Sequence, residues 1–292
     1  MSSFVKMQHY VPRFYLGGFS SKGVINCYDI TNSRKFPASV ENIACEKGFY
    51  EIYKHPKNET ERRLAGIERN CSKVIYKLIE SEDLGSLKKQ ERIVLNYYVV
   101  IQELRTRGMR EELRNILAQL KSALVERGLR EGEKLYDEIK DRQNEEYYKW
   151  WQQSMFVDAP EFTRMLSSLR CVLVQNESEM VFWTSDNPVT RYNPVDLRPF
   201  GNLGLLSRGI QVYFPLTPRL SLLYYDPTSY AKLPENWKIT DVENVKYHNS
   251  IQLLSSTRFL LSIDTDFAMA DDYLRENPDI RDTEKRFRLT VK

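Results

Sequence analysis

The sequence has few of the residues and motifs that usually identify a chemistry. Its 292 residues include three histidines and four cysteines, and no two cysteines form a CxxC pair. That pattern argues against a zinc ribbon or a thioredoxin-type redox site. P-loop, GxSxG, HExxH and GxGxxG motifs are also absent. Their absence excludes the best-known signatures of NTPases, α/β-hydrolases, zinc proteases and dinucleotide-binding domains.

The charges of the chain are nearly balanced, and no long apolar run is present. The 43 basic and 40 acidic residues leave a net charge of +3, so nucleic acid would need a local basic patch. No run approaches the roughly eighteen apolar residues of a membrane helix, and the chain does not start with a basic-then-apolar leader. We therefore expect a cytoplasmic protein with no membrane partner, in which the cysteines are reduced and mostly buried.

The apolar residues, 41% of the chain, are enough for a sizeable core, and they recur with clear periods. Residues 24–29 and 34–36 flank a turn and predict a hairpin. Helical spacing begins after Asn58 and continues through a long helical stretch from about 87 to 126 and a polar helix over 131–153. The segment IVLNYYVVIQEL within the long stretch is apolar nearly all round, which is typical of a buried helix.

The pattern changes at Cys171. Short apolar runs predict strands joined by loops rich in Asn, Pro and Gly: CVLVQ, MVFWTS, IQVYFPLT, LSLLYYD and RFLLSI. A late helix is expected over DVENVKYHNSIQLLSS, with His248 and Asn249 at its surface, and another helix after Asp271. We predict a single α+β domain over residues 1–292. Its helical part, at about 58–169, packs against a mostly antiparallel sheet at about 170–265.

The first candidate site is the segment MQHYVPRFYLGGFS, residues 7–20. His9 can transfer protons near neutral pH. Arg13, four residues later, can bind an anion through two hydrogen bonds. The aromatic residues around them allow another interpretation, in which the segment is an N-terminal arm clipped into the core. The sequence leaves both interpretations open.

The second candidate is the segment QELRTRGMRE. Gln102 and Arg105 lie three residues apart and share a helix face. Arg105 directly follows the most apolar part of the helix, where a charged group is either paired in the interior or faces a cavity. Arg107, Arg110 and Arg114 add a positive stretch that would suit phosphates. Their acidic neighbours also fit an ordinary solvated helix surface.

The third candidate is the segment FWTSDNPVTRYNP. An apolar strand ends there in Ser185, Asp186 and Asn187, and Pro188 prevents its continuation. Binding groups are often displayed at such strand ends. Asp186 would serve as a general base, a metal ligand or the partner of His9 or Arg105. The alternative is an Asx turn, in which the side chain closes its own backbone.

Taken together and in this order, the three segments resemble the bacterial family known as domain of unknown function 4238. The matching motifs are HYVPRFYL (9–16), FYEI (49–52) followed by a helix with Glu68, QELRT (102–106) and TSDNPV (184–189), within residues 8–263. The family often has proline after Arg-Thr, where this chain has Arg107. The resemblance implies no reaction. It implies one unit that contains His9, Arg13, Gln102, Arg105, Asp186 and Asn187.

Two functions fit these residues. The first is a hydrolase of a phosphate-containing substrate, most simply a nuclease. Its catalytic residues would be His9, Arg105 and Asp186. Its substrate, a nucleic acid or a nucleotide, would be bound by Arg13, Gln102 and Asn187. Asp186 and Glu68 would hold a divalent metal such as Mg²⁺ or Mn²⁺, or orient His9.

The second function is a non-catalytic module that binds a nucleotide or a protein. The same polar groups would then form a buried network that stiffens the junction between the helical and sheet parts. The sequence does not decide whether the protein is an enzyme. A role in phage defence or toxicity follows only from the kind of family.

Overall fold

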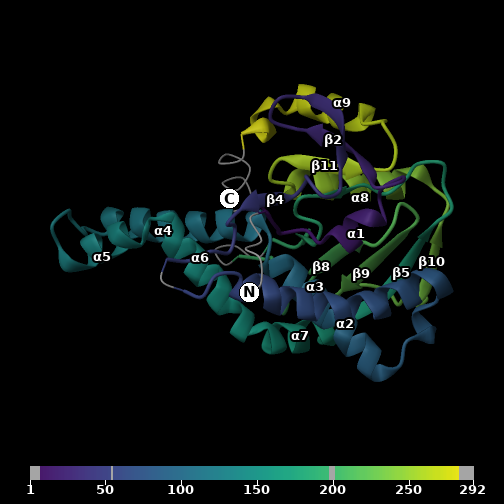
Figure 1. Cartoon of the computed structure of the whole chain (residues 1–292), viewed down its shortest axis with the longest axis horizontal. Coiled ribbons are helices and arrows are strands. Elements are labelled where there is room, and N and C mark those ends of the chain that lie inside the picture. The colour runs from purple at the N-terminus through teal and green to yellow at the C-terminus, as the bar shows by residue number, and fades with distance from the viewer. Residues whose placement is uncertain (1–6, 54, 197–200, 283–292) are drawn as a thin grey trace.

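A computed structural model describes residues 7–53, 55–196 and 201–282 of the chain. In this part of the chain the strands form a five-stranded, a four-stranded and a two-stranded sheet, and helices lie around and between them (Figure 1). The fold is α+β, as the sequence predicts. No helix in the described ranges is long and apolar enough to cross a membrane.

The five-stranded sheet follows the order β10-β5-β9-β8-β7. Its strands are β10 (Asn236–Ile239), β5 (Arg170–Asn176), β9 (Leu220–Tyr225), β8 (Gln211–Pro215) and β7 (Thr190–Tyr192). All neighbours are antiparallel except β10 and β5. Every residue of β9, LSLLYY, is buried, because helices cover both faces of this sheet.

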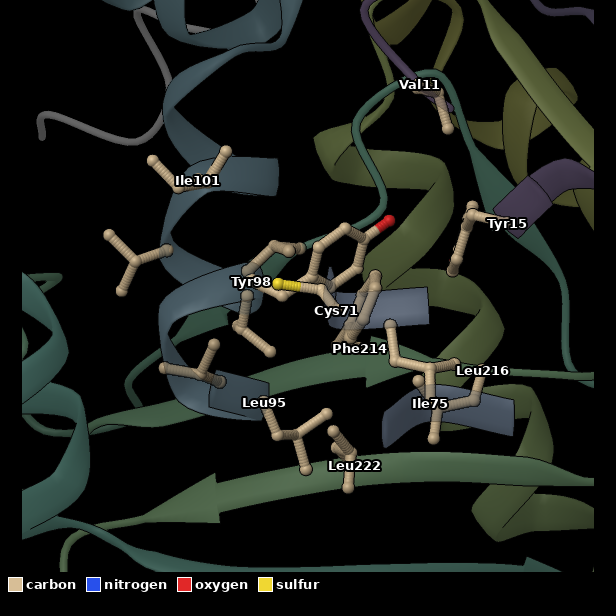
Figure 2. Close-up of a cluster of buried hydrophobic side chains, with 14 of the residues drawn as sticks. Val11, Tyr15, Cys71, Ile75, Leu95, Tyr98, Ile101, Phe214, Leu216 and Leu222 are labelled. Atoms are coloured by element: carbon tan, nitrogen blue, oxygen red, sulfur yellow. The ribbon is translucent and has the colours of Figure 1, made fainter. Parts of the chain in front are cut away.

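The core on one face of this sheet packs against α3 (Lys89–Leu104), which lies beside α2 (Glu59–Ser81) and α7 (Ala159–Ser168). Figure 2 shows Leu95 and Tyr98 of α3 meeting Phe214 and Leu222 of the sheet. The other face packs against α8 (Val242–Ser255). The apolar segment IVLNYYVVIQEL is thus the buried helix that the sequence predicts.

The four-stranded sheet combines two strands from the N-terminal part of the chain with two from its C-terminal part. Its order is β3 (Arg34–Ser39), β2 (Val24–Asp29), β11 (Phe259–Ser262) and β6 (Thr184–Ser185), all antiparallel. The β2–β3 hairpin is confirmed. The expectation that MVFWTS forms one strand is wrong, because only its last two residues pair, as β6. One face of this sheet packs on α8 and α9 (Ala268–Glu276).

The long helical stretch at 87–126 is two helices rather than one. After α3 the chain breaks at Arg105, and α4 (Arg107–Glu126) starts behind Thr106, whose hydroxyl accepts from the amide of Met109. The polar helix at 131–153 is likewise split into α5 (Lys134–Arg142) and α6 (Glu145–Ser154) by the N-cap Asn144. In Figure 1, α4, α5 and α6 extend away from the sheets.

The N-terminal segment lies between both larger sheets and α3. It contains β1 (Met7–His9), which pairs with β4 (Cys45–Lys47), and the short helix α1 (Arg13–Gly17). The ring of Tyr15 stacks on Phe214 with 5.1 Å between centroids, and its hydroxyl lies 2.7 Å from the Thr184 hydroxyl oxygen. Val11 and Tyr15 are both buried in this core (Figure 2). The aromatic residues of the arm therefore anchor it, as in the clip interpretation.

Candidate functional site

Arg105 is held inside the protein at the end of α3, with 1% of its side chain exposed. Its Nη1 donates to Glu68 at 2.6 Å, its Nη2 to the carbonyl oxygen of His9 at 2.7 Å, and its Nε to the hydroxyl of Tyr50 at 3.2 Å. A planar guanidinium can make these bonds in three directions at once. Arg105 thus joins α2, the segment after β4 and the N-terminal arm.

Gln102 acts on the same arm from one turn earlier. It is fully buried, and its Nε2 donates to the carbonyl oxygen of Tyr10 at 3.2 Å. Its Oε1 and the hydroxyl of Tyr98, one turn further back on α3, have no hydrogen-bond partner in the described part of the chain. The side-chain amide of Gln102 therefore holds the backbone of the N-terminal arm at Tyr10.

His9 lies beside Arg105 but keeps its imidazole for another contact. Its Nε2 lies 3.2 Å from the carbonyl oxygen of Val40, which makes Nε2 the protonated nitrogen of the neutral ring and leaves a lone pair on Nδ1. Burial lowers the pKa of His9, and the charges of Arg13 and Arg105 act in the same direction. The imidazole is therefore neutral at pH 7.

Arg13 is mostly exposed, at 62% of its side chain, and its Nη1 lies 3.9 Å from Glu41. Glu61, on α2, lies close enough to Arg105 to feel its charge. Burial raises the pKa of Glu61, and the positive charge of Arg105 lowers it. The structure thus brings together His9, Arg105 and Glu68, with Arg13 at the edge.

Asp186 belongs to a separate network. It is fully buried just after β6, and its carboxylate accepts four hydrogen bonds from the chain that leads into β11. The donors are the Thr257 amide (2.8 Å) and hydroxyl (2.6 Å) and the amides of Arg258 (2.8 Å) and Phe259 (3.1 Å). Burial raises the pKa of Asp186, whereas these donors lower it. The carboxylate fixes the loop between α8 and β11.

Asn187 closes the same turn. Its backbone amide donates to the Ser185 hydroxyl at 3.1 Å and its side chain donates to the carbonyl oxygen of Ser255 at 3.0 Å. Its side-chain amide also lies against the first turn of α4, because a Cβ on Gly108 would stand 2.7 Å from Asn187 Cγ. Asn187 thus ties this turn to both α8 and α4.

The candidate metal ligands are both engaged and lie in different networks. Glu68 is paired with Arg105, and Asp186 accepts from the residues before and within β11. Within the described ranges, no group of three or more His, Cys, Asp or Glu side chains is arranged to hold a metal ion. In this structure Glu68 holds the guanidinium of Arg105, and Asp186 holds the backbone of residues 257–259.

A groove of about 590 Å³ lies where the candidate segments approach each other. Residues 36–39 of β3 line the groove, and so do residues 42–46, which lead into and begin β4. Tyr10, Asp186, Phe259 and the first residue of α4, Arg107, complete the lining together with Arg258. The first, second and third sequence segments each contribute a residue to this groove.

Two arginines and two carboxylates, Glu46 and Asp186, lie in the lining of the groove. Arg107 is 44% exposed, and its Nη1 donates to Glu46 at 2.8 Å. Arg258 is 51% exposed, with Nε and Nη2 on Asp29 and its guanidinium 4.7 Å from the centre of the Phe259 ring. Its Nη1 makes no hydrogen bond to other described residues. Both side chains are thus positioned by neighbours and still reach solvent.

The chain matches a known protein family over most of its length. The model of the family described as Protein of unknown function (DUF4238) matches residues 7–266. The chain belongs to DUF4238. No curated protein and no solved structure matches it.

Within this DUF4238 chain, the motif residues play two kinds of role. His9 (through its backbone), Gln102 and Arg105 hold the N-terminal arm, whereas Tyr10 and Asp186 line the groove. Arg107, at the position where the family often has proline, is the first helical residue of α4. Proline is favoured at that position too, so the helix starts there in either case.

Sequence reasoning missed several residues of both networks. Tyr50 lies in the quoted FYEI motif, but its hydroxyl contact with Arg105 depends on folding. Glu46 lies in the short strand β4 and Arg258 directly precedes β11, and no local pattern in the sequence marks either residue. His248 and Asn249 were expected at a helix surface. They are instead buried against Phe182 and Trp183, because α8 lies between two sheets.

Proposed function

We propose that this DUF4238 protein is a non-catalytic binding module that takes a phosphate-bearing ligand, most simply a nucleotide, in the groove between β3 and the segment 42–46. The observation that carries the proposal is the pair of half-exposed arginines, Arg107 and Arg258, in a lining that also contains aromatic rings. Arginine binds phosphate oxygens through two parallel hydrogen bonds, and exposed rings can stack on a base.

The buried networks support this proposal because they occupy the groups that a hydrolase would need. Asp186 lines the groove, but its carboxylate accepts four hydrogen bonds. Its oxygens are therefore engaged in holding the chain and do not serve as a general base. Arg105 is engaged by three partners and 1% exposed. Buried networks in which Arg105 and Asp186 are each held by several partners make a rigid frame for a binding site.

A peptide strand is a less suitable occupant of the same groove. β3 is an edge strand of its sheet, and an added strand would need its outward amides. Pro37, which lines the groove in the middle of β3, has no amide hydrogen to donate. The edge therefore disfavours strand addition, and a small anion is the better fit.

The binding proposal is tested by calorimetric titration of the full chain with AMP and ATP, and with short single-stranded RNA and DNA. We expect Arg107→Ala and Arg258→Ala each to weaken nucleotide binding about tenfold or more, since a hydrogen bond to a charged group contributes about 1.5–3 kcal/mol. Arg13→Ala is the matched control, because Arg13 is exposed and lies outside the groove. Equal affinities in all four proteins would reject the groove as the site.

The hydrolase hypothesis, most simply a nuclease, stays a second proposal, and one observation favours it. Burial and the charges of Arg13 and Arg105 lower the pKa of His9, and its Nε2 is engaged by Val40, so the neutral ring keeps a lone pair on Nδ1, which is the form that a general base needs. Incubation with RNA, DNA and nucleotides, with and without Mg²⁺ or Mn²⁺, tests it directly. Turnover that is lost in His9→Gln but kept in a His55→Gln control would establish the hydrolase and overturn the non-catalytic proposal.

We also propose a cytoplasmic location. All four cysteines are free thiols in the structure, and Cys27 and Cys71 are buried. Free thiols persist in reducing compartments. Fractionation of cells that express the full chain, with a periplasmic and a cytoplasmic marker protein, tests this location.

A further inference from the structure

We infer that one exposed face of α4 is a self-association surface, through which two copies of this chain pair their helical arms in an antiparallel dimer. The helical arm is the region of α4, α5 and α6, residues 107–154, which extends away from the sheets in Figure 1. The inference does not depend on what the groove binds, because Arg107 is the residue of α4 that lines the groove and it lies outside this face.

The helix α4 buries only one of its sides. Leu113 and Leu117 are buried in a small apolar cluster with residues of α5 and α6. Ile116 and Leu120 lie one helical turn apart, beside that buried side, and are 48% and 49% exposed. Two neighbouring aliphatic side chains are thus left half in water, and covering them is favourable.

A charged residue of opposite sign stands at each end of this face. Glu112 lies four residues before Ile116, and Arg127 lies seven residues after Leu120 at the end of α4. Spacings of four and seven residues keep side chains on one face of a helix. Both Glu112 and Arg127 are exposed. The face therefore runs from an acid through an apolar centre to a base.

Neither of these two charges is neutralised within the described part of the chain, where no ion pair is formed by Glu112 or by Arg127. The surrounding chain partly desolvates Glu112 and raises its pKa, and the charge of Arg191 lowers it. Arg191 is itself paired with Glu103, at 2.6 Å. Both ends of the face are thus available to a partner.

This order of residues is complementary to itself. An antiparallel pairing of two α4 helices, centred between residues 119 and 120, brings Glu112 of each copy to Arg127 of the other. The same pairing sets Ile116 against Ala123, which is small and exposed. A twofold interface requires such reciprocity, and large side chains against small ones let two helices approach closely.

The charge and shape of the helical arm favour an identical copy over other occupants. Residues 107–154 contain ten basic and ten acidic side chains, so a second arm is not repelled and no basic surface is offered to nucleic acid or to an anionic membrane. The 20 residues of α4 span about 30 Å. An antiparallel pairing along this length places the sheets of the two copies at opposite ends of the paired arms.

Sedimentation equilibrium of the full chain at pH 7.5 tests the inference. We expect the mass to rise from 34.5 kDa toward twice that value between about 1 and 100 μM, because an interface of this modest size dissociates in the micromolar range. Ile116→Glu should stay monomeric over the same range. Val125→Glu is the matched control, since Val125 is 44% exposed and lies on the opposite face of α4.

A charge exchange tests the antiparallel register. Glu112→Lys and Arg127→Glu should each weaken the dimer about tenfold or more, because each creates two like-charge contacts in a twofold interface. The double variant should restore dimerisation. It carries both unfavourable charges for the helix dipole, so a restored dimer cannot come from a more stable α4. Circular dichroism checks that all variants remain folded.

Three results would overturn the inference. A full chain that stays monomeric at about 100 μM has no such surface. Equal effects of Ile116→Glu and Val125→Glu, or no effect of either, would place any dimer contact elsewhere on the molecule. A double variant that dimerises no better than the two single variants would contradict the pairing of Glu112 with Arg127.

Discussion

Arg105 holds the backbone of His9 rather than its imidazole, through a 2.7 Å hydrogen bond from Nη2 to the carbonyl oxygen. The side chain of His9 points to Val40 instead. Arg105 and His9, the two residues best suited to catalysis by their chemistry, thus meet in a contact that holds the backbone. Buried arginines that bridge several segments in this way act through geometry as much as charge.

The first prediction concerns this clamp. Arg105→Lys keeps the charge but cannot contact Glu68, Tyr50 and the His9 carbonyl together. We expect it to lower the free energy of unfolding by about 2–4 kcal/mol, measured by urea denaturation, because it leaves buried partners unsatisfied. It should also expose the arm to limited proteolysis.

Arg13→Lys serves as the control for the clamp, since Arg13 is 62% exposed and its Nη1 lies 3.9 Å from Glu41. Its stability and digestion pattern should match those of the unchanged chain. Equal stability of Arg105→Lys and the unchanged chain would show that the three contacts of Arg105 do not hold the N-terminal arm.

The second prediction concerns Asp186. Asp186→Asn replaces one acceptor oxygen with a donor that faces amides of the 257–259 segment. We expect a loss of about 2–4 kcal/mol in stability, because a donor left without a partner inside a protein is costly. Differential scanning calorimetry measures this loss. Asp264→Asn, at an exposed position just after β11, should have almost no effect.

The third prediction tests the contact between α4 and the turn after β6. In Gly108→Ala the new methyl group would collide with Asn187, which is anchored to Ser255 and cannot swing away freely. We expect a cost of about 1–3 kcal/mol despite the better helix propensity of alanine. Asn187→Ala should cost stability by itself through the lost bond to Ser255. The double variant should cost clearly less than the sum of the two, and strict additivity would contradict the contact.

The fourth prediction is a pH dependence. His248 is buried beside Phe182 and Tyr213, and burial lowers its pKa to about 3. In the unfolded chain the same ring binds a proton near pH 6.5. The contribution of neutral His248 to stability is therefore complete above pH 6.5 and declines as the pH falls toward 3, by up to about 1.4 kcal/mol per pH unit.

His248→Gln removes that titration. The variant should be less stable at every pH through lost ring packing, but its stability should fall less steeply between pH 7 and pH 5. Urea denaturation at several pH values gives both slopes. Parallel slopes for the variant and the unchanged chain would mean that His248 is protonated without cost in the fold.

The periodic parts of the sequence predicted the elements they form. α2, α8, the β2–β3 hairpin and β5 all appear where hydrophobic spacing indicates them, because their apolar residues must be buried. The break between α3 and α4 was missed. The helical pattern continues across residues 105 and 106, but Thr106 takes an extended backbone and caps α4, and a single threonine inside a helical pattern did not mark that break.

The candidate site divides along the same line. The sequence by itself determined the local setting of each polar group: a histidine on an aromatic arm, an arginine after a buried helix and an aspartate at a strand end. Local pattern and composition are enough for that. Only the tertiary structure decided which of them meet. Arg105 lies 37 residues from Glu68 and 96 from His9 in sequence, and Asp186 accepts bonds from residues 71–73 positions away. Such contacts depend on how sheets and helices pack, and no local period encodes that packing.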